Sequence, residues 1–105
     1  MVMGESYFRV EIDGSSRPVR VTAAGELDAA SADQLATALT DAQRAAAGIA
    51  LDLTDVTFID SSGLRVIAAE VARADDTGEA FTISGASDAV RRIFEMTGLS
   101  ALLAS

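Results

Sequence analysis

The segment formed by residues 49–71 changes its hydrophobic period from two residues to that of a helix across one short turn. In its first part apolar side chains alternate with small or polar ones, which is typical of a strand with one face more buried than the other. In its second part apolar residues recur at helical spacing, while Arg65, Glu70 and Arg73 fall on other faces, where we expect them to be hydrated. This change of period predicts a strand–turn–helix unit and therefore an α/β fold.

The turn within this unit, residues 58–64, carries a carboxylate and two hydroxyls at Asp60, Ser61 and Ser62. In an open α/β sheet the carboxyl ends of the strands form the edge where ligands and partners usually bind. A serine at the start of a helix often caps a free backbone N–H, and Gly63 allows other groups to approach the backbone closely. On the local pattern alone, capping is the more common role. A helix N-terminus also favours an added anion, so a second reading is that Ser61 carries a phosphate.

The chain before this unit predicts a hairpin and a helix. Two strand-like runs, residues 7–12 and 19–22, flank a turn sequence at 13–16 and indicate an antiparallel pair. Residues 31–34 have the serine and glutamine of a capping box, and the helix that follows should end at 45–48.

The chain after the unit predicts one more strand and helix. Residues 75–78 have turn composition, residues 80–83 read as a strand, and Ser87 is a helix cap. The last helix should end near Gly98 and place its apolar residues in the core: Val90, Ile93, Phe94 and Met96. Together the elements predict a single domain over residues 1–105, in which a small mixed β-sheet opens with an antiparallel hairpin and helices pack on it.

Composition excludes several classes of function. The chain has no cysteine and no histidine, which removes thiolate chemistry and the commonest general base and metal ligand, so we predict no catalytic, metal-binding or cofactor-binding residue. Sixteen acidic residues outnumber eight arginines and give a net charge of −8, which disfavours nucleic acid and anionic lipid. No apolar run approaches the roughly 20 residues that span a bilayer, and the amino end lacks a signal-peptide pattern, so we expect a cytoplasmic protein without membrane insertion.

Three blocks in a fixed order, residues 25–28, 58–64 and 89–99, give the chain a strong resemblance to the anti-sigma factor antagonists of bacteria, which are built on the STAS domain. The resemblance covers nearly the whole chain. It implies that Ser61 is the phosphoacceptor and that Ser62 is the neighbouring helix-start residue. It further implies a partner-binding surface formed by Asp28, Asp60, Ser61, Ser62, Gly63 and Leu64.

The resemblance also implies the partners. They are an anti-sigma factor that is at the same time a serine kinase, and a metal-dependent serine phosphatase that acts on the phosphorylated form. The antagonist itself performs no chemistry and holds no ATP. In its unphosphorylated form it binds the kinase, so that a sigma factor is released, and phosphorylation at Ser61 switches it off.

Some readings stay open at this point. Asp28 and Asp60 are as readily structural as partner-binding, and Arg91 and Arg92 fit a solvated helix face. Members of the family often continue into a further helix, which we expect to be missing here. We also expect a monomer or weak dimer. The alternative function is a soluble STAS adaptor subunit of a transporter, such as a lipid-transport complex, or of a stress-sensing complex.

Overall fold

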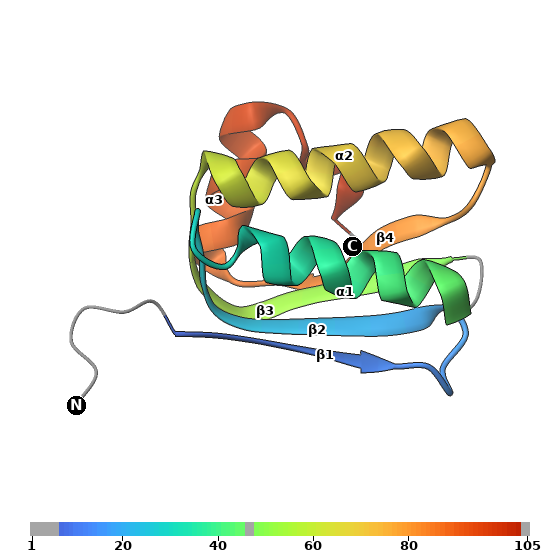
Figure 1. The fold of residues 1–105 in the computed structure, drawn as a ribbon. Coiled ribbons are helices and arrows are strands. Elements are labelled where there is room, and N and C mark those ends of the chain that lie inside the picture. The colour runs from blue at the N-terminus through green and yellow to red at the C-terminus, as the bar shows by residue number, and fades with distance from the viewer. Residues whose placement is uncertain (1–6, 46–47, 104–105) are drawn as a thin grey trace.

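The computed structural model describes residues 7–45 and 48–103. Its four strands form one sheet in the order β1-β2-β3-β4, with β1 antiparallel to β2 and the other neighbours parallel (Figure 1). The elements in chain order are β1 (Phe8–Asp13), β2 (Val19–Leu27), α1 (Ala32–Ala45), β3 (Ile49–Ile59), α2 (Ser61–Thr77), β4 (Phe81–Ala86), α3 (Asp88–Thr97) and the 3₁₀ turn η1 (Ser100–Leu102). The predicted α/β fold, a mixed sheet that opens with a hairpin, is confirmed.

The helices α1 and α2 lie side by side across one face of the sheet (Figure 1). Val21, Leu51 and Ile83 occupy one row across three strands, and all three are fully buried on this face. Burying an aliphatic side chain of this size contributes about 1.5–3 kcal/mol. The opposite face of the sheet is polar in the same strands, where Arg20 and Thr22 alternate with the buried valines. This alternation is why the helices cover one face only.

The third helix packs where β4 is too short to continue the sheet. β4 pairs with β3 only as far as Leu53, and α3 lies along the rest of β3. Ser87 caps α3 as predicted, accepting from the Val90 N–H at 3.2 Å, while its hydroxyl donates to the Val56 carbonyl at 2.6 Å. Phe94 is fully buried, as predicted.

Several boundaries differ from the predicted ones. The segment 75–78, predicted as a turn, is the last turn of α2, which ends at Thr77 with Gly78 in the left-handed region at φ 77°. The composition of this segment favours a turn, but α2 extends through it, and Ala74 keeps the last turn of the helix packed on the core. After α3 the described chain forms η1, and Leu103 then bridges to Ile83 of β4 in a parallel sense.

Two side-chain placements were wrong. Met96 is 75% exposed rather than in the core, because α3 buries the row that contains Val90 and Phe94, and Met96 points away from it. Glu70 is buried rather than hydrated, because Arg73 of the same helix pairs with its charge and Gln43 of α1 donates a hydrogen bond to it. Within residues 7–45 and 48–103, no helix combines the length and the apolar character needed to cross a membrane.

Candidate functional site at the β3–α2 junction

The candidate site lies where two parallel strands end together. Leu27 and Ile59 are paired at the carboxyl ends of β2 and β3, and Asp28 and Asp60 follow them directly. The backbone N–H of Asp60 donates to the carbonyl of Leu27 at 3.2 Å. This hydrogen bond joins the segments that leave the two strands. The structure therefore brings both predicted carboxylates to one edge of the sheet.

Asp60 is the N-cap of α2. Its backbone is extended, with φ −120° and ψ −171°, and its Oδ1 accepts from the N–H groups of Ser62 at 2.8 Å and Gly63 at 3.3 Å. The expectation that a serine caps this helix was wrong. A carboxylate one residue earlier caps equally well, so α2 begins at Ser61, which is left without a capping role.

Ser61 and Ser62 differ in exposure. Ser61 is exposed at the first position of α2, whereas Ser62 is half-buried. Within the described parts of the chain, the Ser61 hydroxyl has no hydrogen-bond partner. Of the two hydroxyls, that of Ser61 is therefore the more accessible from solvent.

Gly63 and Leu64 join the helix to the core. A Cβ on Gly63 would lie 3.1 Å from Ile59 Cγ1 and closer still to Leu27, and Gly63 is buried. Leu64 is half-buried, packs against the core and donates its N–H to the Asp60 carbonyl at 3.0 Å. These contacts fix the first turn of α2 against the sheet. A partner contact at either residue stays a prediction.

Asp28 organises the loop between β2 and α1. Its Oδ1 accepts from the N–H groups of Ala30 at 3.0 Å and Ser31 at 3.2 Å. The buried Ser31 hydroxyl donates to the Glu26 carbonyl at 2.6 Å and accepts from the Asp28 N–H at 2.9 Å. The predicted capping box is therefore wrong: in the described structure Ser31 Oγ serves this loop, and Gln34 donates its N–H to the Ser31 carbonyl instead.

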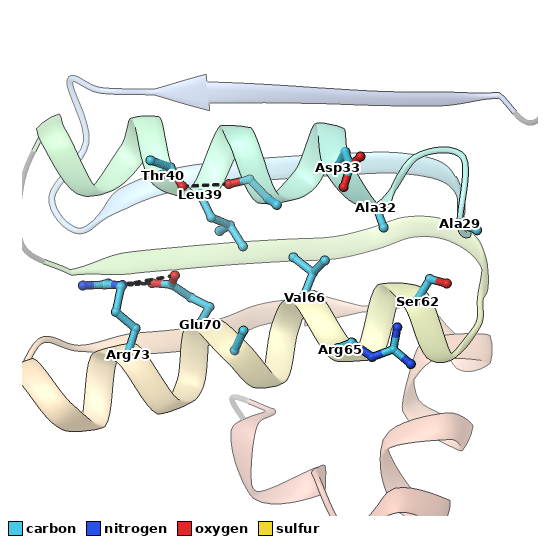
Figure 2. Close-up of a pocket in the computed structure, with 12 residues that line it drawn as sticks. Ala29, Ala32, Asp33, Leu39, Thr40, Ser62, Arg65, Val66, Glu70 and Arg73 are labelled. Carbon is cyan, nitrogen blue, oxygen red and sulfur yellow. Dashed lines mark hydrogen bonds and ion pairs between the residues drawn. The ribbon is translucent and has the colours of Figure 1, made fainter.

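A groove between α1 and α2 begins at this edge. It has a volume of about 500 Å³ and runs from Ser62 and Arg65 to Glu70 and Arg73 (Figure 2). Small residues keep it open: Ala29 of the β2–α1 loop, Ala32 and Ala36 of α1, and Ala69 of α2. Sequence reasoning missed the groove, although Ala32 and Ala36, which are one helical turn apart on α1, are a signal for it.

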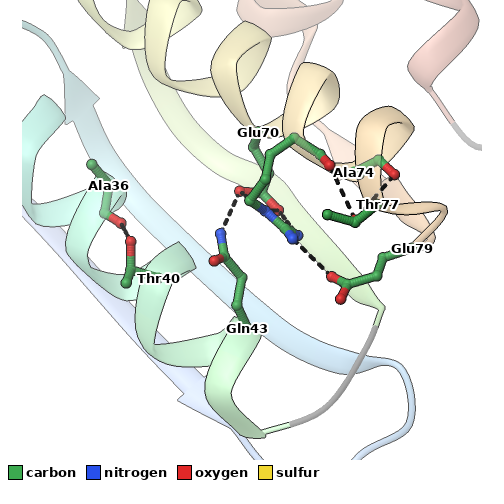
Figure 3. A network of polar contacts seen from close by, with 8 residues as sticks. Ala36, Thr40, Gln43, Glu70, Ala74, Thr77 and Glu79 are labelled. Carbon is green, nitrogen blue, oxygen red and sulfur yellow. Dashed lines mark hydrogen bonds and ion pairs between the residues drawn. The ribbon is translucent and has the colours of Figure 1, made fainter.

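The far end of the groove is closed by a polar network (Figure 3). Glu70 accepts from Gln43 Nε2 of α1 at 2.8 Å and from Arg73 at 2.6 Å, and Arg73 also contacts Glu79 at 2.8 Å. Hydrogen bonds to Glu70 and then to Glu79 raise the pKa of Arg73 above its ordinary value. This network holds α1, α2 and the start of the β4 connection together, away from Ser61.

Sequence reasoning also missed an exposed aromatic residue beside the site. Phe58 is 49% exposed and pairs with Glu26 at the carboxyl end of β3. Strand alternation gives the signal for it, because Ile59 faces the core and its neighbour must face the other way.

Comparison with known proteins agrees with this fold. The family model described as "Mlab, STAS domain" matches residues 10–104. The anti-sigma-B factor antagonist of Listeria monocytogenes is 34% identical over 87 residues, which cover 81% of this chain and 75% of that protein.

Two solved structures show the same fold. The anti-sigma factor antagonist SpoIIAA in its unphosphorylated form has a TM-score of 0.78 and 21% identity, covering 91% of this chain and 86% of that one. SpoIIAA of Bacillus in its phosphorylated form has a TM-score of 0.73 and 21% identity, covering 91% and 89%. The predicted STAS fold is thereby confirmed.

Proposed function

Since the chain belongs to the STAS-domain family of anti-sigma factor antagonists, we propose that it switches partners in the cytoplasm. In its unphosphorylated form it binds an anti-sigma factor that is also a serine kinase, and the bound anti-sigma factor releases a sigma factor. Phosphorylation at Ser61 ends this binding, and a metal-dependent serine phosphatase restores it. The chain acts as a monomer or weak dimer and contributes no catalysis.

The observation that carries the proposal is the position of Ser61. It is exposed at the first position of α2, its hydroxyl is unused within the described chain, and it lies on the strand edge that Asp28 and Asp60 also occupy. The partner surface proposed here consists of Asp28, Asp60, Ser61, Ser62, Gly63 and Leu64.

Local electrostatics are sufficient for the switch. A phosphoserine adds about 1.5–2 negative charges and three acceptor oxygens. Two unit charges about 6 Å apart interact by about 3 kcal/mol at an effective dielectric constant near 20, and about 1.4 kcal/mol corresponds to a tenfold change in affinity. Asp60 is held in place by two backbone N–H groups and adjoins Ser61. A phosphate on Ser61 therefore changes the charge of the surface without requiring the backbone of the helix start to refold.

The test is a pull-down from lysate of the source cells with tagged wild type, Ser61→Ala, Ser61→Asp and the control Ser84→Asp, which changes an exposed serine of β4. Circular dichroism first establishes that all baits are folded. We expect wild type, Ser61→Ala and Ser84→Asp to retain a serine-kinase anti-sigma factor, and Ser61→Asp to lose it. With the recovered kinase and ATP, mass spectrometry should place one phosphate on wild type, at Ser61, and none on Ser61→Ala.

Other outcomes contradict the proposal. Equal retention of the kinase by wild type and Ser61→Asp would remove Ser61 from the switch. Recovery of transporter subunits by all four baits would instead support the adaptor role that the sequence left as an alternative.

A further inference from the structure

We propose that Arg65 is the residue that pairs with the phosphate on Ser61, from one turn further along α2. This inference rests on the proposed function, because it concerns the phosphorylated form of the same serine. It adds a residue with a defined role in that form, which lies outside the partner surface proposed above.

Most backbone N–H groups at the start of α2 already have an acceptor, so few remain to donate to a phosphate. The N–H groups of Ser62 and Gly63 already donate to Asp60 Oδ1, and the N–H of Leu64 donates to the Asp60 carbonyl. A phosphate on Ser61 therefore meets a carboxylate that occupies the donors an anion would otherwise use. Its countercharge has to come from a side chain.

Arg65 has the right position for this role. Residues four apart on a helix are separated by only about 40° around its axis, so Ser61 and Arg65 share a face. Helical side chains also lean toward the amino end, which carries the Arg65 guanidinium back toward the first turn. Figure 2 shows this direction: the Arg65 side chain runs toward the amino end of α2, on the side of Ser62.

Arg65 is also available, in contrast to the other arginine of α2. Arg73 is held by Glu70 and Glu79. Within residues 7–45 and 48–103, the exposed Arg65 side chain makes no hydrogen bond or ion pair. A planar guanidinium donates two parallel hydrogen bonds to phosphate oxygens, so the pair can form without breaking an existing contact.

The experiment uses the full chain with phosphoserine installed at position 61 by genetic encoding, so that no kinase is needed. The phosphate is titrated by 31P NMR in three proteins: wild type, Arg65→Gln and the control Arg44→Gln. Arg44 is exposed in the last turn of α1, at the other end of that helix from the site, and its loss changes the net charge equally. Circular dichroism establishes that all three are folded.

We expect the second pKa of the phosphate to be lower in wild type than in Arg65→Gln. The titration midpoint of Arg65→Gln should rise by about half a pH unit, as expected for a partly exposed ion pair. Arg44→Gln should titrate like wild type. Identical midpoints in all three proteins, or equal shifts in the two variants, would overturn the role of Arg65.

The two proposals fail separately. The titration is made on the isolated chain, so its outcome does not depend on which proteins the pull-down recovers. If Arg65→Gln moves the midpoint while phosphorylated chain still binds the kinase, the pairing stands and the switch is refuted.

Discussion

A Cβ atom on Gly63 would lie 2.6 Å from Cγ of Leu27, so the backbone of α2 packs directly on the Leu27 side chain of β2. Real Cβ atoms do not approach a branched carbon so closely, and Leu27 is fully buried and has no free space to move into. We therefore predict that Gly63→Ala lowers the free energy of unfolding by about 1–3 kcal/mol, the usual cost of overpacking.

Urea denaturation of Gly63→Ala measures this loss. The matched control is Gly14→Ala, since a Cβ at Gly14 meets no atom within 4 Å. Equal midpoints for Gly63→Ala and Gly14→Ala would show that α2 can shift away from β2 at little cost.

Two substitutions of Asp60 distinguish the stability that its N-cap hydrogen bonds contribute from the stability that its charge contributes. Asparagine caps as well as aspartate, so Asp60→Asn should leave the free energy of unfolding nearly unchanged, whereas Asp60→Ala should lower it by about 1 kcal/mol. Both variants remove the same negative charge beside Ser61. Thermal unfolding at low ionic strength compares them, and a loss of equal size in both variants would mean that the charge, rather than the cap, stabilises α2.

The buried Glu70 is predicted to stabilise the pairing of α1 with α2. Glu70→Ala leaves Gln43 and Arg73 without their shared acceptor, and we expect a loss of about 1–3 kcal/mol in the free energy of unfolding. Asp75→Ala, which removes an exposed carboxylate from the same helix, should stay within about 0.5 kcal/mol of wild type. If both variants unfold at the same urea concentration, the network adds nothing measurable.

The β1–β2 turn has a pH-dependent contact. The side chain of Ser15 donates to Asp13 Oδ1 at 2.6 Å and its backbone N–H donates at 3.0 Å, and with Arg20 these groups lower the pKa of Asp13 below its ordinary value. A lowered pKa in the folded state means that the contact stabilises the fold above the ordinary pKa of aspartate, and that this contribution disappears as pH falls through the folded value.

NMR titration of the Asp13 carboxyl checks this relationship. In Ser15→Ala the pKa of Asp13 should rise toward its ordinary value. The variant should be less stable than wild type near neutral pH, and the difference in stability should shrink as pH falls through the pKa of Asp13 in the folded state. An unchanged Asp13 titration in Ser15→Ala would assign the lowered pKa to the backbone N–H of residue 15 and to Arg20, which the substitution leaves in place.

The order and type of the elements could be predicted from the sequence because each apolar period reports one buried face. The two-residue period of β3 and the helical period of α2 both correspond to real burial, and Ser87 and Gly98 mark the ends of α3 as expected. Such local signals suffice to predict an element when one of its faces packs on the core and the other faces solvent.

The errors arise where a residue's environment is set by distant partners. The burial of Glu70 depends on Gln43, 27 residues away, and no local pattern contains that contact. At the start of α2, Asp60 and Ser61 are both good caps, and only the backbone geometry decides that the carboxylate takes the N–H groups. That decision leaves the serine exposed.

The hydrogen bond from Asp60 to the Leu27 carbonyl bears on the entropy of association. It joins the loop after β2 to the first turn of α2, and each side is also tied to its own backbone by an aspartate. Ordering loops on binding costs free energy, and segments that are fixed beforehand avoid that cost. A protein that docks on this edge meets two segments that behave as one rigid body, so the entropy lost on association falls mainly on the other partner.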